Sequence, residues 1–172
     1  MERFGILLNT KRRMKPISDR KESPPMILET DAKPLTYVPN LDPKVVKVVA
    51  CVIERGGEFL ITKRLKTSHL GHCWEFPGGK LEIGESLAEC AIRECREEID
   101  VVVKPLRLID EISHAYPEKS VHLYFVLCRL ETGNPKAVEC ADWCWVQPRR
   151  LSDFEFPEAD KKIIDGLLRS SR

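Results

Sequence analysis

The 172-residue sequence has almost no net charge, no long apolar run and no CxxC pair. Its 28 Lys and Arg residues against 27 Asp and Glu leave a net charge of +1, which does not favour binding to nucleic acid or to a membrane surface. No apolar stretch approaches the roughly 20 residues of a membrane span, and no secretory signal pattern is present. We therefore expect a cytoplasmic protein, monomer or homodimer, that binds neither membranes nor nucleic acid stably.

The seven cysteines are an odd number, and several have apolar neighbours. This pattern favours reduced, buried thiols over a disulfide framework. Cys140 and Cys144 could form half of a metal site, but no second Cys or His pair stands at zinc-type spacing. We expect no structural zinc.

The first quarter of the chain differs from the rest in composition. It contains six of the twelve prolines, interleaved with charges and without a helical or alternating period. We predict that residues 1–43 form a poorly ordered basic extension and that residues 44–172 form one domain. Met14 and Met26 leave a later start open, and the extension could be a targeting segment, a partner contact or a tail.

The remaining sequence predicts an α+β domain with helices packed on a mixed sheet. Strands at 45–53 and 58–64 flank Arg55-Gly56-Gly57 as a β-hairpin, and a short strand at 74–76 runs into Pro77-Gly78-Gly79, which predicts a loop. A helix is expected from 85 or 86 to 99, because this stretch lacks Gly and Pro and has one apolar stripe. The last elements are strands at 106–113, 121–129 and 143–146 and a helix at 158–168.

Three glutamates share one face of the helix predicted for 85–99. Glu94, Glu97 and Glu98 are spaced i, i+3 and i+4, so at about 100° per residue they lie within about 100° of one another. Such a stripe is ordinarily a solvated acidic face. The alternative is a site for a hard divalent cation, Mg²⁺ or Mn²⁺, because these ions take carboxylate oxygens as ligands.

The residues before the helix favour the cation site. Gly78-Gly79-Lys80 leaves space where a phosphate or a metal must approach the backbone, and it adds one positive charge. The full pattern is Gly79-x5-Glu85-x7-Arg93-Glu94-Cys95-x-Glu97-Glu98-x-Asp100-Val101. It resembles the Nudix box, a loop-helix-loop signature, at every charged position and every spacing. Where the family has an aliphatic residue and a glycine, this chain has Cys95 and Asp100, and we expect a small stability cost with retained activity.

The resemblance implies a Nudix fold, an α/β/α sandwich with a mixed β-sheet. It also implies that the three glutamates of the helix bind the catalytic Mg²⁺ or Mn²⁺ ions, with the Gly79 carbonyl as a further ligand. One of the glutamates would orient or deprotonate the attacking water. Arg93 would hold the glutamates in place, and Glu85 would brace the loop.

The stretch from about Val45 to Leu168 resembles the MutT-type branch of the family, the nucleoside triphosphate pyrophosphohydrolases. The segments that carry this resemblance include Ile61-Thr62-Lys63-Arg64, Trp74-Glu75-Phe76-Pro77-Gly78-Gly79-Lys80 and the region from Tyr116 to Phe125. They imply substrate-binding roles for Arg64, His69, Glu75, Phe76, Lys80, Lys119 and Asp160. Glu139, six residues before Trp145, resembles the additional metal-binding glutamate of this branch.

Asp160 stands in Phe156-Pro157-Glu158-Ala159-Asp160, which resembles the F-P-x-A-N/D element whose last residue contacts the base edge. An ionised Asp only accepts hydrogen bonds, whereas Asn donates and accepts. Oxidised purines fit if Asp160 is protonated or meets a donor-rich edge, and cytosine, which has an amino donor, is the competing base. Asp160 could also be a plain N-terminal helix acid that the macrodipole favours.

We therefore expect Mg²⁺-dependent hydrolysis of nucleoside triphosphates, such as 8-oxo-dGTP or CTP and dCTP derivatives, to the monophosphate and pyrophosphate. Two alternatives stay open. One is hydrolysis of another nucleoside diphosphate derivative, such as ADP-ribose or a dinucleoside polyphosphate. The other is a Nudix-fold module that binds a nucleotide without turnover; the presence of every acid of the box favours an enzyme.

Overall fold

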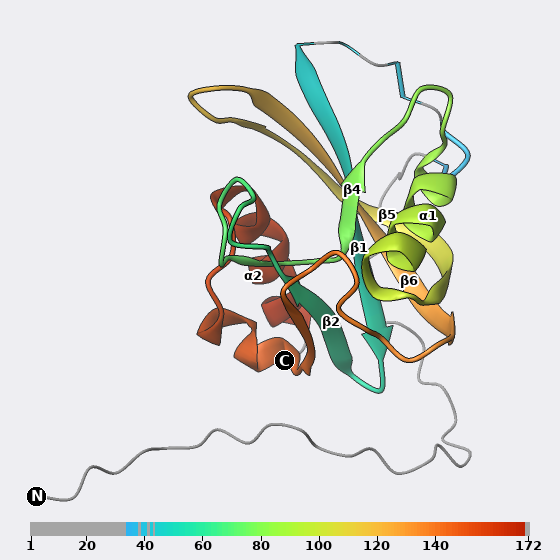
Figure 1. Ribbon diagram of the computed structural model, residues 1–172, viewed down its shortest axis with the longest axis vertical. Helices are drawn as coiled ribbons and strands as arrows, with labels where there is room; N and C mark the ends of the chain where they lie inside the picture. Colours follow the sequence, from blue (N-terminus) through green and yellow to red (C-terminus); the bar gives the residue numbers. More distant parts are fainter. Residues whose placement is uncertain (1–33, 38, 41, 43, 171–172) are drawn as a thin grey trace, which may run out of the picture.

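The computed structural model describes residues 34–170 apart from 38, 41 and 43. Within this range a seven-stranded sheet lies between two α-helices (Figure 1). The strands are β1 (Val45–Arg55), β2 (Glu58–Lys63), β3 (Trp74–Glu75), β4 (Gly78–Lys80), β5 (Val102–Ala115), β6 (Ser120–Thr132) and β7 (Asp142–Val146). The α-helices are α1 (Leu87–Ile99) and α2 (Lys161–Ser170), and the 3₁₀ helices are η1 (Pro148–Asp153) and η2 (Glu158–Asp160).

Strand β1 lies at the centre of the sheet. The hydrogen-bonded order is β3-β2-β1-β6-β5, with β4 also paired to β1 and β7 to β2. β1 and β6 run parallel, and the other pairings are antiparallel. The mixed sheet predicted from the sequence is confirmed.

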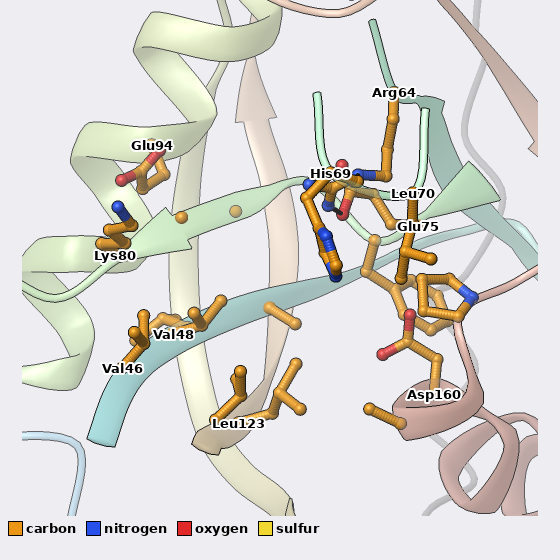
Figure 2. A pocket seen from close by; sticks show the side chains of 18 of the residues that line it. Val46, Val48, Arg64, His69, Leu70, Glu75, Lys80, Glu94, Leu123 and Asp160 are labelled. Atoms are coloured by element: carbon orange, nitrogen blue, oxygen red, sulfur yellow. Dashed lines mark hydrogen bonds and ion pairs between the residues drawn. The ribbon is translucent and has the colours of Figure 1, made fainter. Parts of the chain in front are cut away.

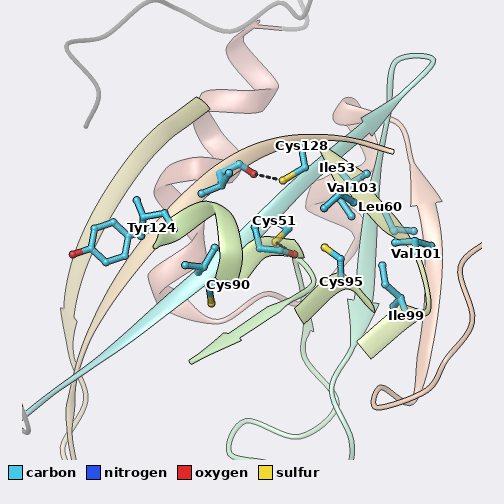
Figure 3. Packing of buried hydrophobic residues seen from close by; sticks show 14 of the residues in the cluster. Cys51, Ile53, Leu60, Cys90, Cys95, Ile99, Val101, Val103, Tyr124 and Cys128 are labelled. Carbon is cyan, nitrogen blue, oxygen red and sulfur yellow. Dashed lines mark hydrogen bonds between the residues drawn. The ribbon is translucent and has the colours of Figure 1, made fainter. Parts of the chain in front are cut away.

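Alternate residues of β1 point to opposite faces of the sheet, as the two-residue period of a strand requires. Val49, Cys51 and Ile53 are fully buried and pack with α1 in one apolar cluster (Figure 3). Ala50 and Val52 pack with α2 in the other. Because one helix covers each face, the predicted α/β/α sandwich is also confirmed.

Residues 78–80 form strand β4, so the loop that was predicted there is wrong. Beyond their hairpin turn β1 and β2 separate, and the segment 74–80 lies between them, with β3 paired to β2 and β4 paired to β1. An added Cβ on Gly78 would lie 2.0 Å from the Val49 carbonyl oxygen. Pairing with β1 therefore overrides the local loop preference, and glycine permits the close approach of the two backbones.

Helix α1 begins at a capping box, which confirms the helix predicted for this region. The Ser86 hydroxyl accepts from the Glu89 N–H, and the Glu89 carboxylate accepts from the Ser86 N–H at 2.9 Å. The N–H groups of the first two helical residues, Leu87 and Ala88, donate to the carbonyls of Tyr37 and Leu35 at 3.3 and 3.1 Å. These bonds satisfy donors that a helix leaves unpaired at its start.

Residues 34–37 thus contact the domain although they belong to the predicted extension. Leu35 and Tyr37 also pack against the apolar cluster beneath α1. The division of the chain at 43/44 stays a prediction, and residues 1–33 lie outside the described residues.

Helix α1 ends at Asp100, where the Nudix box has glycine. Asp100 adopts the left-handed conformation that this position requires, with φ 55° and ψ 44°, and its N–H donates to the Arg96 carbonyl at 3.1 Å. The Glu98 carbonyl accepts from the N–H groups of Val138 and Glu139 at 3.0 and 3.1 Å. The end of α1 therefore holds the loop that carries Glu139.

Several other element boundaries differ from the prediction. β5 is longer at both ends than 106–113, and it includes Pro105 at a register shift on the edge of the sheet, where a missing N–H donor is tolerated. β6 extends beyond 121–129. The final helix starts as the 3₁₀ turn η2 and becomes α-helical at Lys161, and η1 was not predicted. Short 3₁₀ segments have too few residues to show a sequence period.

None of the helices in the described part of the chain is long and apolar enough to cross a membrane. The seven cysteines are free thiols, as their apolar neighbours indicated. The buried ones are Cys51, Cys90, Cys95, Cys128 and Cys140.

Candidate active site

Arg93 ties the acidic face of α1 to the loop before the helix. Its Nε and Nη2 donate to the two carboxylate oxygens of Glu85 at 2.8 and 2.9 Å. Its Nη1 donates to Glu94 Oε1 at 2.7 Å and to Glu97 Oε2 at 3.1 Å, and its Nη2 donates to the Lys80 carbonyl at 3.0 Å. The bond to Glu85 is the main cause that raises the pKa of Arg93 and lowers the pKa of Glu85, so both groups stay charged.

Replacement of Arg93 by lysine is expected to lower kcat/KM for nucleotide hydrolysis by about 10- to 100-fold, because a compact ammonium cannot serve three carboxylates and a carbonyl at once. Initial rates at several Mg²⁺ concentrations measure the effect. The matched control is Arg96→Lys, which removes an exposed guanidinium from the same helix. Equal rates for the two variants would show that Arg93 does not organise the acids.

Glu94 and Glu98 are the more buried acids of the helix face. Glu98 is 9% exposed, and its Oε2 accepts from the Gly78 N–H at 2.9 Å. Burial raises the pKa of Glu98 to about 7, although the Gly78 N–H and the Thr62 hydroxyl lower it. Burial also raises the pKa of Glu94, although the guanidinium of Arg93 lowers it. Because burial penalises the negative charge of both groups, a cation between them would be favourable.

These acids fit a divalent cation, although they do not enclose one. Among the described residues no three Asp, Glu, His or Cys side chains come together closely enough to hold a metal by themselves. Glu94, Glu98 and Glu139 line one cavity with Gly79, whereas Glu97 is half exposed and turned toward the guanidinium. Two carboxylates suffice for Mg²⁺, which usually keeps waters and substrate phosphates as its other ligands.

Glycine at position 79 keeps the acidic part of the cavity open. A Cβ added to Gly79 would lie 2.3 Å from the carboxylate of Glu94. The backbone of β4 can therefore approach the helix face directly, with the Gly79 Cα next to the Glu94 carboxylate. The sequence predicted space for a phosphate or a metal at these glycines, and the structure shows in addition that β4 packs directly against α1 at Glu94.

The same cavity joins the acidic end to a second polar end, with a volume of about 320 Å³ that suits a small-molecule site. Figure 2 shows Glu94 and Lys80 at one end and Arg64, His69 and Asp160 at the other. Apolar residues of β1 and β6 line the same cavity, namely Val46, Val48, Val121 and Leu123. A ligand with an anionic group at one end and an apolar ring with a polar edge at the other would match this cavity.

Asp160 is a buried acid at the second end of the cavity. It is 5% exposed, and burial raises the pKa of Asp160 to about 7, with Glu75 raising it further and Arg64 lowering it. Arg64 forms an ion pair with Glu75 and donates from Nε to the His69 carbonyl at 2.8 Å. Near neutral pH, Asp160 can therefore present either an acceptor alone or a donor with an acceptor.

Aromatic rings form the wall beside Asp160. Phe76 is 3% exposed and packs against Phe125 and Phe156, with ring centroids 6.4 and 5.9 Å away. Tyr116 stands edge-on to His69 at 5.4 Å. Both Phe76 and Tyr116 line the cavity, so a flat ring would meet apolar surface there.

The structure brings most of the predicted site residues to this one cavity, and the predicted members that line it are Arg64, His69, Glu75, Phe76, Gly79, Lys80, Glu94, Glu98, Lys119, Glu139 and Asp160. Glu85, Arg93 and Glu97 lie outside its lining and act on it through hydrogen bonds. The prediction missed Tyr116 and Leu70 in the lining. Both lie in connections between strands, where the sequence has no period that assigns a residue to the cavity.

The sequence of this domain matches a known protein family. The family described as NUDIX domain matches residues 48–166, well over half of the chain. This chain is a Nudix hydrolase. The Nudix match includes the whole loop-helix-loop signature and Asp160, and the contacts of residues 34–37 with α1 lie before it.

Relatives of this Nudix hydrolase include MutT-type enzymes, which confirms the predicted branch. An 8-oxo-dGTP diphosphatase of Haemophilus influenzae is 33% identical over 129 residues, which cover 74% of this chain and 95% of that protein. A CTP pyrophosphohydrolase of Escherichia coli is 28% identical over 125 residues, covering 73% and 93%. The solution structure of the E. coli ORF135 protein matches with a TM-score of 0.64 and 28% identity, covering 75% of this chain and 94% of that one.

Proposed function

We propose that this Nudix hydrolase cleaves nucleoside triphosphates to the monophosphate and pyrophosphate with the help of Mg²⁺ or Mn²⁺. The observation that carries the proposal is the one cavity that has Glu94, Glu98 and Gly79 at its acidic end and Asp160 at its other end. A triphosphate requires cations around its phosphates, and a base requires hydrogen-bonding groups in an apolar slot. The same cavity offers carboxylates that can bind cations at one end and a polar side chain with apolar walls at the other.

The proposed roles follow from the contacts of each residue. Divalent cations supply charge neutralisation at phosphate oxygens and make water more acidic. The three glutamates of α1 and the Gly79 carbonyl would hold them, with Glu139 from the loop that α1 positions. Arg93 keeps the carboxylates oriented, and one glutamate orients the attacking water or takes its proton. Lys80 and Lys119 line the cavity and offer positive charge to the phosphates.

The base end supports two substrate classes. In its protonated form Asp160 donates and accepts, which suits the carbonyl and N–H groups on the edge of 8-oxoguanine. In its ionised form it accepts from the amino group of cytosine. The names of the two relatives, an 8-oxo-dGTP diphosphatase and a CTP pyrophosphohydrolase, agree with these classes. We take 8-oxo-dGTP as the first candidate and cytosine nucleotides as the second.

A nucleotide panel at fixed Mg²⁺ tests the proposed function. It compares CTP, 5-methyl-dCTP, dGTP, 8-oxo-dGTP and ADP-ribose, with the phosphate products of each reaction identified. We expect pyrophosphate and a monophosphate from at least one triphosphate. Faster cleavage of ADP-ribose, or release of orthophosphate from the triphosphates, would overturn the proposal.

The preference between the two bases is expected to depend on pH through Asp160. Because the pKa of Asp160 is about 7, raising the pH from about 6 to about 8 converts it from mostly protonated to mostly ionised. The kcat/KM ratio of CTP over 8-oxo-dGTP should therefore rise with pH by about 10- to 100-fold. Because the ratio compares two substrates at the same pH, titration of enzyme groups that change both kcat/KM values equally does not alter it.

The control for this prediction is Asp160→Asn, which keeps a donor and an acceptor at every pH. Its ratio should stay flat and should favour 8-oxo-dGTP throughout. An equal pH dependence in Asp160→Asn and the wild type would assign the effect to another group, and a flat wild-type ratio would contradict the role of Asp160.

A further inference from the structure

The loop between β6 and β7, residues 133–141, passes the C-terminal end of α1 and carries Glu139 (Figure 1). The loop contains no helix or strand, and most of its residues are exposed. A segment of this kind has few buried apolar contacts that could fix its position. Glu139 nevertheless lines the cavity, so its place there depends on the other contacts of the loop.

Backbone hydrogen bonds join this loop to the last turn of α1. The Lys136 N–H donates to the Ile99 carbonyl at 3.0 Å. The N–H groups of Val138 and Glu139 both donate to the Glu98 carbonyl. A helix leaves the carbonyls of its last turn without partners inside the helix, and the loop supplies donors for two of them.

A side-chain contact reinforces the same junction. The Lys136 ammonium donates to the Asp100 carboxylate at 2.6 Å. Gly133, at the start of the loop, lies against the same residue, because an added Cβ would be 3.0 Å from the Asp100 carbonyl oxygen. The loop therefore meets Asp100 twice before it reaches Glu139.

The ion pair depends on a residue in which this chain differs from the Nudix box. The box has glycine where Asp100 stands, and glycine has no side chain that could pair with Lys136. The left-handed conformation of Asp100, with φ 55°, costs more for aspartate than for glycine. The carboxylate offsets this cost by holding the loop.

We propose that Asp100 is a positioning residue that tethers the loop through Lys136 and so keeps Glu139 at the acidic end of the cavity. The inference rests on the proposed function, because it concerns a proposed ligand of the divalent cation. Neither Asp100 nor Lys136 lines the cavity, so both act on the site through the loop.

Amide hydrogen exchange of the full-length protein without added metal tests the tether. The amides of Val138 and Glu139 report the opening of the loop, because both donate to the Glu98 carbonyl. Asp100→Asn removes the charge but keeps a residue that tolerates the left-handed conformation. It should accelerate exchange of these two amides by about 2- to 5-fold, the scale of an exposed ion pair. Lys136→Arg keeps the pair and should exchange at the wild-type rate.

Mn²⁺ binding tests the consequence for the site. Mn²⁺ is titrated into the same proteins, and free Mn²⁺ is followed by electron paramagnetic resonance. Asp100→Asn should bind Mn²⁺ about 2- to 5-fold more weakly than the wild type. This difference should vanish in about 1 M NaCl, because salt screens an exposed ion pair. A change caused by backbone strain alone would persist in salt.

The matched control is Asp153→Asn, which breaks the ion pair of Arg150 and Asp153 in η1. The side chains of that pair are 65% and 53% exposed, against 68% and 52% for Lys136 and Asp100. The control should change neither the exchange of the loop amides nor Mn²⁺ binding. Asp100→Gly, which restores the residue of the Nudix box, should match Asp100→Asn in both measurements while its melting temperature stays close to that of the wild type.

Three results would contradict the proposals at different points. Wild-type exchange of the loop amides in Asp100→Asn would overturn the tether. Faster exchange with unchanged Mn²⁺ binding would overturn its role in positioning Glu139 and leave the proposed function intact. A wild-type protein that binds no Mn²⁺ would overturn the proposed metal site, whereas the exchange rates would still decide whether the tether exists.

Discussion

Glu98→Gln is expected to lower kcat for nucleotide hydrolysis by on the order of 10³-fold or more. Glu98 is almost completely buried at the acidic end of the cavity, where one of its oxygens is engaged by the Gly78 N–H. Glutamine preserves the shape and can still accept that bond, but it removes the negative charge and one acceptor oxygen. The loss should appear in initial rates measured at saturating nucleotide and Mg²⁺.

The matched control for Glu98→Gln is Glu89→Gln on the same helix. Glu89 serves the capping box at the start of α1, and glutamine can occupy that position equally well. Its kcat should stay within about 3-fold of the wild type. Glu97→Gln is expected to resemble Glu98→Gln, with a smaller effect on stability because Glu97 is half exposed. Wild-type turnover in both Glu97→Gln and Glu98→Gln would rule out the proposed mechanism.

The sequence predicted these acids because their placement depends on local geometry. Residues spaced i, i+3 and i+4 share a face on any α-helix, and the charged pattern from Gly79 to Glu98 has fixed spacing. Arg93 and Glu85 are eight residues apart, and the structure joins them by two hydrogen bonds. Helix geometry predicts only the shared acidic face; Glu85 lies before α1, and its bond to Arg93 was expected from the resemblance to the Nudix box.

Features that depend on tertiary contacts could not be predicted in the same way. Gly78–Lys80 pairs with β1 only because β1 and β2 diverge, and local propensity reports nothing about that divergence. The Gly78 N–H donates to Glu98 across 20 positions of the sequence, between a strand and a helix that no local rule relates.

Asp160 lies between these two cases. Its motif predicts a contact with the base, and the structure places it in the lining of the cavity. Burial raises its pKa and Glu75 raises it further, whereas Arg64 lowers it, and Glu75 and Arg64 are both far from Asp160 in the chain. The motif therefore predicts the residue, whereas its pKa depends on tertiary contacts; that its charge state selects between the two candidate bases is part of our proposal.

Gly78→Ala is expected to reduce the free energy of unfolding by about 3 kcal/mol or more, because the new methyl group has no space. It would lie 2.0 Å from the Val49 carbonyl oxygen and 3.1 Å from the Ala50 Cα, and both contacts are with the backbone of β1. A flexible side chain could move aside, but β1 is the central strand of the sheet and is paired to β6 along its length. Strand β4 must therefore shift away. Urea denaturation followed by circular dichroism measures the loss.

The control for Gly78→Ala is Gly57→Ala in the hairpin turn. Gly57 also has a positive φ, +79°, but an added Cβ would meet nothing within 4 Å, so backbone strain of about 1 kcal/mol is the whole expected cost. The difference between the two variants isolates the clash with β1. It also predicts a difference in activity, since a shift of β4 would move the Gly78 N–H away from Glu98 and the backbone of Gly79 away from Glu94. If Gly78→Ala were no less stable and no less active than Gly57→Ala, the close pairing of β4 with β1 would be wrong.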